Sequence, residues 1–274
     1  MEILDGRKVS NEIIENIKHV IENNNLKVRF AIIWIGNDEA SSIYVNNKIN
    51  KCKLVGIEAE LYHLDSNISE EEILKLIDRL NEREEINGIL LQSPVPNHID
   101  IIKCFNRISP KKDVDGFSNI SIGNIVQGRE AITSCTPKGI IKLLDYYHID
   151  LEGKDVCIIN RSNIIGKPLF QLLLRRNATV TVCHSKTKDL KKHTLNSDIV
   201  ICAVGKPKFL TEDMISEGTV VVDVGISRVD GKVVGDVDFE NVKDKCSYIS
   251  PVPGGVGPMT IAMVLENILN TAKK

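Results

Sequence analysis

The sequence has no strong excess of charge of either sign. Its 35 lysine and arginine residues nearly balance 37 acidic residues, which gives a net charge of −2 at pH 7. A protein that holds nucleic acid through a broad basic surface carries a clear positive excess. We therefore expect no nucleic-acid partner.

Long apolar runs are also missing. No segment approaches the roughly 20 apolar residues that a membrane-spanning helix needs. Residues 1–5 carry no basic region that leads into an apolar run, which is the pattern of a signal peptide. We therefore expect no membrane association and a cytoplasmic location.

Paired cysteine motifs are absent as well. The 7 cysteines are odd in number, and none shows Cys-x-x-Cys spacing. Several lie inside apolar runs of strand length, so we expect reduced, buried thiols rather than disulfides or metal ligands. Aromatic residues make up only 4% of the 274 residues, but 42% are hydrophobic, which is enough to form real cores.

Apolar runs of strand length alternate with helical patterns along the chain, which predicts an α/β protein with largely parallel sheets. The capping box Ser69-Glu70-Glu71-Glu72 predicts the start of a helix that ends near residue 81. The other elements expected in the first half are helices over about 6–22 and 40–54, and strands at 30–35, 59–64 and 88–92.

The second half has the pattern of a doubly wound, Rossmann-type nucleotide domain. Thr136-Pro137 predicts a helix start with Thr136 as the cap. Residues 251–258 are rich in proline and glycine, which predicts irregular structure. A helix at 259–271 carries an apolar stripe, and we expect it to return to the first domain. The four expected strands lie at 155–159, 179–183, 199–204 and 220–224.

Tyr44 and Lys48 lie four residues apart on a predicted helix and therefore on the same face. A tyrosine one turn from a lysine can form a proton-handling pair, although the same spacing is found on ordinary amphipathic helices. A lysine that moves a proton near neutral pH must bind that proton less tightly than a free lysine does. Gln92 follows a predicted strand and is an uncharged partner that could orient the amine without holding it protonated.

Residues 160–168 follow one strand and open a helix, where backbone N–H groups and the helix dipole favour an anion. The segment lacks a complete Gly-x-Gly-x-x-Gly motif, so a plain strand-to-helix turn is the alternative. The next strand ends in Cys183-His184-Ser185, without the acidic residue that would bind the ribose hydroxyls of NAD. This absence favours NADP over NAD.

Two further segments could bind a ligand. A carboxylate in Asp113-Val114-Asp115-Gly116 could accept hydrogen bonds from adjacent N–H donors, such as the amino-pyrimidine edge of a pterin. Asp-Gly is also a common turn dipeptide. The glycines of residues 253–257 would let the backbone approach a flat ligand closely, although an interdomain linker would have the same composition.

Taken in this order, these segments resemble the bifunctional methylenetetrahydrofolate dehydrogenase/methenyltetrahydrofolate cyclohydrolase family over nearly the whole chain. The segments that carry the resemblance are Tyr44-Val45-x-x-Lys48, Gln92-x-Pro94-x-Pro96, Lys112-Asp113-Val114-Asp115-Gly116-Phe117, Cys135-Thr136-Pro137, Arg161-Ser162, His184-Ser185, Asp223-Val224-Gly225-Ile226 and Pro251-Val252-Pro253-Gly254-Gly255-Val256-Gly257-Pro258-Met259-Thr260.

The resemblance implies a role for each matching residue. Lys48 would transfer the proton of the cyclohydrolase step, and Tyr44 would stack on the folate. Gln92 would tune Lys48, and Asp115 would hold the pterin. Further substrate contacts would come from Leu91, Ser93, Pro253, Gly254, Gly255, Val256 and Gly257. NADP would be held by Asn160, Arg161, Ser162, Ser185 and Ile226.

The resemblance also implies the activity and its organisation. Methylenetetrahydrofolate would be oxidised with NADP, with NAD as the alternative cofactor, and the methenyl product would be hydrolysed to formyltetrahydrofolate without a metal. Residues 1–117, with the helix 258–274, would form the folate-binding catalytic domain, and residues 118–257 the NADP-binding domain. The implied assembly is a homodimer joined through the nucleotide domain.

Three residues depart from the family pattern. Asn160 stands where glycine is usual, and we expect it to preserve the turn because asparagine tolerates a positive φ. Ser93 stands where the family mostly has an apolar residue. Ser227 stands where the family frequently has asparagine.

Two other functions stay open. One is a carbonyl reductase with a Tyr-x-x-x-Lys pair, which would normally follow the nucleotide motif in sequence. The other is an inactive protein that binds folate or nucleotide.

Overall fold

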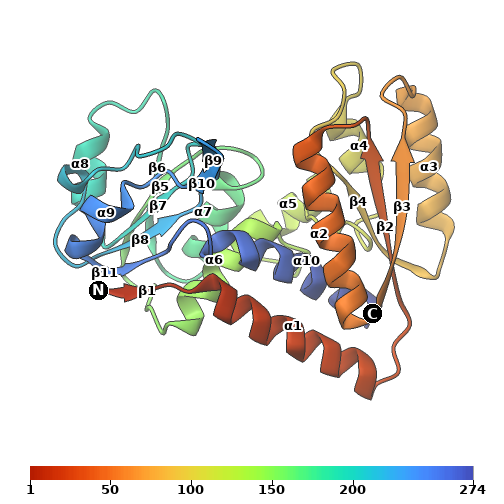
Figure 1. Cartoon of the computed structure of the whole chain (residues 1–274), viewed down its shortest axis with the longest axis horizontal. Helices are drawn as coiled ribbons and strands as arrows, with labels where there is room; N and C mark the ends of the chain where they lie inside the picture. The colour runs from red at the N-terminus through yellow and green to blue at the C-terminus, as the bar shows by residue number, and fades with distance from the viewer. Residues whose placement is uncertain (274) are drawn as a thin grey trace. The chain divides into compact units, whose positions relative to one another are not determined.

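Parallel strands form the cores of two separate units in the computed structural model, which describes residues 1–273 (Figure 1). The six-stranded unit contains residues 1–11 and 135–260. The three-stranded unit contains residues 12–134 and continues from residue 261. The α/β class expected from the sequence is confirmed. The boundary between the units lies after Ser134, whereas the sequence pattern placed it after Phe117. In addition, residues 1–11 belong to the six-stranded unit and not to the three-stranded one.

The three-stranded unit is built on a parallel sheet in the order β3 (Ile57–Leu64), β2 (Val28–Ile35) and β4 (Ile86–Leu91). Alternate residues of β2, such as Ala31 and Ile33, pack into a core formed with two helices, α3 (Glu70–Glu82) and α4 (Ile101–Arg107). Helix α2 (Glu39–Val55) runs beside the sheet (Figure 1). The other helices are α1 (Gly6–Asn23), whose first residues belong to the six-stranded unit, and α5 (Asn119–Val126).

The capping box in this unit folds as expected, and a glycine ends the preceding helix. Ser69 caps α3 in a complete capping box with Glu72. Helix α2 ends at Gly56, whose φ of 83° lets its N–H reach the carbonyl groups of Cys52 and Lys53. Residue Gly88 on β4 is also required, because a Cβ there would lie 2.4 Å from the side chain of Val114. The segment 112–114 therefore runs close against β4, with a parallel bridge between Ile89 and Asp113.

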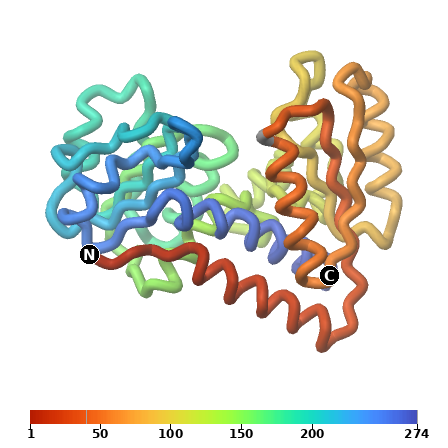
Figure 2. Tube along the Cα trace, viewed as in Figure 1, coloured from red at the N-terminus to blue at the C-terminus, as the bar shows by residue number. Residues whose placement is uncertain are grey.

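The six-stranded unit has the strand order β1 (Glu2–Ile3), β11 (Cys246–Ile249), β8 (Thr219–Asp223), β7 (Ile199–Cys202), β5 (Asp155–Ile159) and β6 (Thr179–Cys183), all parallel. The chain runs outward from β5 to β6 and then returns to β7 on the other side of β5, which confirms the doubly wound pattern. The N-terminal β1 pairs with β11, so the first residues of the chain complete a sheet whose other strands come from its second half (Figure 2).

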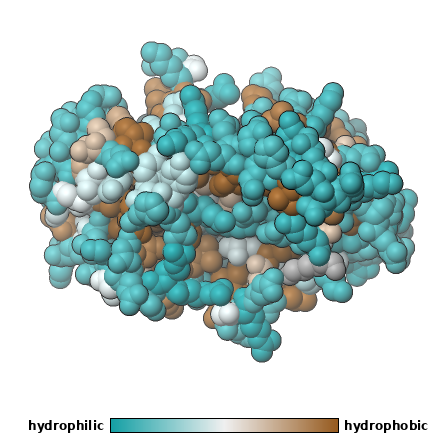
Figure 3. All heavy atoms as spheres, turned by 90° about the horizontal axis from the view of Figure 1, so that it is seen from below, coloured by the Kyte–Doolittle hydropathy of each residue, from teal (hydrophilic) through white to brown (hydrophobic). Residues whose placement is uncertain are grey.

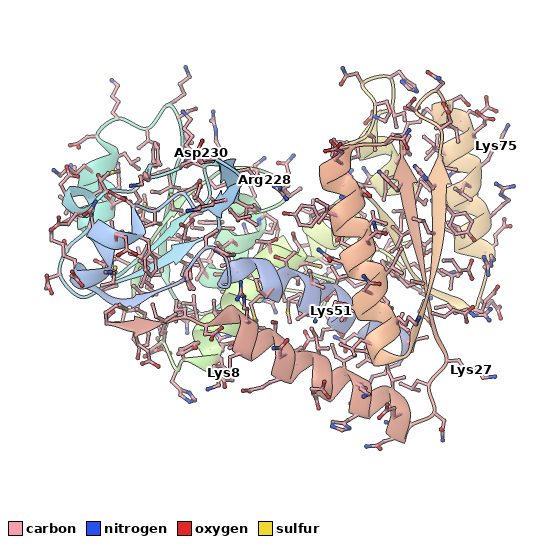
Figure 4. The ribbon with its side chains drawn as sticks, in the orientation of Figure 1. Lys8, Lys27, Lys51, Lys75, Arg228 and Asp230 are labelled. Atoms are coloured by element: carbon pink, nitrogen blue, oxygen red, sulfur yellow. The ribbon has the colours of Figure 1, made fainter. Side chains whose placement is uncertain are left out.

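Helices and one hairpin complete the six-stranded unit. The helices are α6 (Cys135–Tyr146), α7 (Gly166–Leu174), α8 (Leu190–Leu195) and α9 (Phe239–Val242). The hairpin joins β9 (Ser227–Val229) to β10 (Lys232–Val234) and carries Arg228 and Asp230 (Figure 4). Neither the hairpin nor the short strands β1 and β11 were expected, because runs of two to four residues give no clear periodicity.

Two helix starts differ from expectation. Helix α6 begins at Cys135, so Thr136 lies inside the first turn rather than at the cap, and its hydroxyl contacts that of Thr260 at 3.0 Å. Helix α10 (Val256–Ala272) begins within the segment expected to be irregular. Pro258 fits there because the first turn of a helix needs no N–H partner.

The final helix returns to the three-stranded unit, as expected. Asn267 is 3% exposed, and its side-chain amide donates to the carbonyl oxygens of Val114 at 2.8 Å and Thr133 at 3.0 Å. These bonds tie the end of the chain to the segment that contains Asp115.

All 7 cysteines are buried, as the sequence indicated, and none forms a disulfide among the described residues. Within residues 1–273, no helix is long and apolar enough to cross a membrane. The face drawn in Figure 3 is largely hydrophilic, with hydrophobic side chains interspersed.

Candidate active site

A hydrogen bond joins the predicted Tyr44/Lys48 helix to Gln92. The Nζ of Lys48, on α2, donates to the Oε1 of Gln92 at 3.0 Å. Lys48 is half-buried, and Gln92 is only 8% exposed. The amine therefore has a fixed and uncharged neighbour at the end of strand β4.

Backbone and side-chain bonds fix the orientation of this amide. The backbone N–H of Gln92 donates to the carbonyl of Ile33 at 2.8 Å, which continues the β2–β4 ladder past the end of β4. The Nε2 of Gln92 donates to the carbonyl of Ser93 at 2.7 Å. Because the nitrogen faces a carbonyl group, the Oε1 atom must be the one that faces Lys48.

On helix α2, Tyr44 lies one turn before Lys48 and Cys52 lies one turn after it. Tyr44 is 44% exposed and available to a ligand. Cys52 is fully buried, and this burial raises the pKa of its thiol to about 12, against the opposing effect of the Lys48 charge. The thiol therefore stays neutral and adds no negative charge that would hold the lysine protonated.

Asp115 sits in a turn organised by another carboxylate. Asp113 is 2% exposed, and its two oxygens accept from the backbone N–H groups of Gly116, Phe117 and Ser118 and from the hydroxyl of Ser121. Gly116 has a φ of 67°, and a Cβ there would lie within 3 Å of three backbone atoms of residues 132–134. These constraints hold the half-buried Asp115 in one backbone position.

The second group of predicted residues lies in the six-stranded unit. Arg161 is exposed at the turn between β5 and α7, and Ser185 is exposed directly after β6. Both therefore follow the carboxyl ends of neighbouring parallel strands, where nucleotides bind in open α/β sheets. Asn160 does not adopt a positive φ, so the reason expected for its tolerance in the turn is wrong. Its side chain instead forms hydrogen bonds within the turn.

A cavity of about 120 Å³ brings two of the predicted segments together. Ile226 lines it from the end of β8, and Pro253 to Gly255 line it from the loop before α10. Gly257 lies close to Ile226, since a Cβ at this glycine would be 3.7 Å from the Ile226 side chain. The remaining predicted residues, Leu91 and Val256, are buried, and Ser93 is exposed.

Arg7 lines the same cavity and was not anticipated from the sequence. Its backbone N–H donates to the carbonyl of Gly254 at 3.0 Å, and a Cβ at Gly254 would lie 3.3 Å from the Arg7 Nε. No local pattern could have revealed this contact, because the two residues are separated by almost the whole chain. The spacing Asp113-x-Asp115, by contrast, was visible but did not distinguish the buried, structural Asp113 from the half-buried Asp115.

Two buried aspartates shape the backbone beside this cavity. Asp223 accepts from the backbone N–H groups of Gly225, Asp236 and Val237. Asp236 accepts from those of Val204 and Gly205. A Cβ at Gly225 would lie 2.0 Å from the carboxyl carbon of Asp236, so the two segments pack too closely for any side chain there.

The residues of the three-stranded unit can handle a proton and hold a polar flat ligand. Those of the six-stranded unit have the positions and the lack of negative charge that suit a phosphorylated nucleotide. Within residues 1–273, no group of three or more His, Cys, Asp or Glu residues is arranged to hold a metal ion.

Comparison with known proteins matches two segments of the chain to the two domains of one enzyme family. Residues 4–115 match the model of the catalytic domain of tetrahydrofolate dehydrogenase/cyclohydrolase, and residues 134–274 match that of its NAD(P)-binding domain. A bifunctional protein FolD from Aquifex aeolicus is 53% identical over 277 residues, covering 99% of this chain and 95% of the relative.

Solved structures of the same enzyme family have the same fold as this chain. The bifunctional FolD methylenetetrahydrofolate dehydrogenase/cyclohydrolase of Campylobacter jejuni superposes with a TM-score of 0.98 at 48% identity, covering 100% of this chain and 99% of the other. The Trypanosoma brucei enzyme, complexed with NADP cofactor and an inhibitor, gives 0.93 at 33% identity, covering 99% and 97%.

The buried Asp223 predicts a pH dependence of stability. Burial raises its pKa from 3.8 to about 6, so between these values the folded protein binds more protons than the unfolded chain. Stability should therefore fall as pH rises through this window, by up to about 3 kcal/mol from this residue. Urea unfolding of the wild type and Asp223→Asn at pH 4, 5, 6 and 7 measures this effect.

The readout is the slope of unfolding free energy against pH, because Asp223→Asn also loses the bond from Val237 and is less stable at every pH. The decline between pH 4 and 6 should be smaller in Asp223→Asn than in the wild type. Asp230→Asn, on the exposed hairpin, is the matched control and should keep the wild-type slope (Figure 4). Equal slopes in the wild type and Asp223→Asn would contradict the assignment.

Proposed function

Because the chain belongs to the tetrahydrofolate dehydrogenase/cyclohydrolase family, we propose that it oxidises 5,10-methylenetetrahydrofolate and then hydrolyses the product. The first reaction yields 5,10-methenyltetrahydrofolate and NADPH. The second adds water to give 10-formyltetrahydrofolate and a proton. The two activities together interconvert one-carbon units carried by tetrahydrofolate.

The hydrogen bond between Lys48 and Gln92 is the observation that carries this proposal. The methenyl carbon is electrophilic, so the hydrolytic step needs a group that removes a proton from the attacking water. An amine can do this only from its neutral form. The neutral amide orients the Lys48 amine without adding charge, whereas a carboxylate in its place would favour the ammonium form.

The remaining residues of the three-stranded unit position the folate. Tyr44, exposed one turn from Lys48, stacks against its flat ring. Asp115 accepts hydrogen bonds from the N–H donors of the pterin, and the Asp113 turn holds it in place. Leu91 and Ser93, on either side of Gln92, complete this part of the substrate site. The family resemblance also assigns residues 253–257, at the end of the loop before α10 and in its first turn, to the substrate, and their glycines add little side-chain bulk.

The six-stranded unit fits NADP. Residue Gly166 opens α7 where a Cβ would lie 2.1 Å from the carbonyl oxygen of Asn160, so the turn is as tight as a nucleotide fold requires. Arg161, Ser162 and Ser185 would hold the phosphates, and Ile226 would contact the reactive end. When bound, NADP would accept a hydride from the one-carbon bridge of the folate. The protein then mainly aligns the two reactants.

Replacement of Lys48 should separate the two activities. Lys48→Gln removes the proton acceptor, so cyclohydrolase activity should fall by roughly 100-fold or more, in the range expected for lost general base catalysis. Some dehydrogenase activity should survive, because hydride transfer needs no proton acceptor. An assay with methylenetetrahydrofolate and each nicotinamide cofactor, read at two wavelengths for NADPH and methenyltetrahydrofolate, separates the steps.

Lys51→Gln is the matched control, since Lys51 lies on the same helix (Figure 4) and has no part in the proposed site. It should keep both activities. Equal loss of both activities in a folded Lys48→Gln protein would contradict a specific role in hydrolysis. Reduction of carbonyl compounds without folate turnover would identify a reductase instead, and ligand binding without any turnover would identify an inactive binding protein.

We also propose a cytoplasmic homodimer joined through the six-stranded unit. The family resemblance supports the dimer, and 7 buried cysteines without a disulfide suit a reducing compartment. Sedimentation equilibrium should give twice the chain mass of 30.5 kDa. A single-chain mass at micromolar concentration would contradict the dimer.

A further inference from the structure

The side chain of Asn160 occupies the turn between β5 and α7. Its Oδ1 accepts two hydrogen bonds from the backbone of this turn, from the N–H of Ser162 at 2.8 Å and from that of Gly166 at 3.0 Å. Gly166 is the first residue of α7. One side-chain oxygen therefore caps the start of the helix from a position six residues earlier.

The other backbone donors at the start of α7 also have partners inside the turn. The N–H of Ile165 donates to the hydroxyl of Ser162, and that of Lys167 donates to the Ser162 carbonyl. Residue 168 is a proline, which has no N–H, and the N–H of Leu169 donates to the carbonyl of Ile165. The N–H groups of residues 165, 166 and 167 are thus already paired, although the first N–H groups of such a helix are the ones that nucleotide folds direct at phosphate.

The Asn160 side chain is also anchored on its other side. Its Nδ2 donates to the carbonyl of Ala203, which follows β7, at 2.6 Å. A Cβ at Gly166 would lie 2.8 Å from the Asn160 Oδ1, so the amide packs directly against the backbone of the helix start. Since the φ of Asn160 is not positive, the turn does not need asparagine for its backbone shape. The side chain is retained in the turn by its three hydrogen bonds.

We propose that Asn160 takes the place of a phosphate at the start of α7. Recognition of the phosphates of the cofactor then passes from the backbone to side chains, above all to the exposed guanidinium of Arg161. Asn160 is thereby a specificity-determining residue, because it sets how strongly cofactor affinity depends on Arg161. A glycine, the usual residue of the family here, has no side chain that could do this. The inference rests on the proposed use of NADP.

A double-mutant cycle measured by isothermal titration calorimetry with NADP⁺ tests this inference without an activity assay. The four proteins are the wild type, Arg161→Ala, Asn160→Gly and the double variant. Arg161→Ala should raise the Kd about 30-fold or more in the wild-type background, because the guanidinium is the main phosphate partner. With Asn160→Gly, the freed N–H groups can bind phosphate, so the same change should raise the Kd about fivefold or less.

Two further variants test whether the added flexibility of a glycine, and not the loss of the Asn160 amide, changes the dependence on Arg161. Asn160→Ala removes the amide without adding the flexibility of glycine and should give the same reduced dependence on Arg161. Asn177→Gly is the matched control, since Asn177 has a φ of 62° that glycine adopts readily, and the residue lies at the opposite end of α7 from the turn. It should leave the wild-type effect of Arg161→Ala unchanged.

The outcomes separate this inference from the proposed function. An equal Kd increase for Arg161→Ala with and without Asn160 would overturn the inference. So would a Kd more than about threefold higher in Asn160→Gly alone, which would make Asn160 a support for phosphate binding rather than its substitute. Failure of the wild type to bind either NADP⁺ or NAD⁺ would contradict the proposed function itself, and the inference with it.

Discussion

The proposed chemistry depends on one contact, in which the amine of Lys48 donates to the neutral amide of Gln92. The contact exists because the parallel pairing of β2 and β4 continues for one residue beyond β4 and fixes the backbone of Gln92. The amide nitrogen is occupied by the carbonyl of Ser93, which leaves only its oxygen for the lysine. The sheet therefore sets which group faces the amine that α2 carries.

The buried carboxylates of the protein bind backbone N–H groups instead of the Lys48 amine. The buried side chains of Asp113, Asp223 and Asp236 accept hydrogen bonds from backbone N–H groups and shape turns and loop segments. Burying a charge is costly unless it is well paired, and each of these residues has two or more such donors, although in Asp236 both donors face Oδ2 and Oδ1 is buried without a partner. Around Lys48, in contrast, the close neighbours are a neutral amide and a thiol whose pKa burial raises to about 12. The protein thus uses buried charge to fix the backbone, whereas the hydrogen-bond partner of the Lys48 amine is a neutral amide.

Much of this could be predicted from the sequence, because strong periodicity and fixed motifs act locally. The strands at 155–159 and 179–183 were located to the residue, and the cap at Ser69 was read from a single capping box. The contact of Arg7 with Gly254 and the pairing of β1 with β11 could not be found this way, since they join distant segments. The position of Asn160 was noted, but its effect depends on Ala203 and Gly166, which only the folded turn brings together.

The most direct test of the central claim is the pH dependence of methenyltetrahydrofolate hydrolysis by the wild type and Gln92→Glu, with the uncatalysed rate subtracted. A carboxylate beside Lys48 would stabilise the ammonium form. The pH at which the rate reaches half its plateau should then rise by about one unit or more. An unchanged midpoint in a folded and active Gln92→Glu protein would show that the charge of the residue beside Lys48 does not control the reaction.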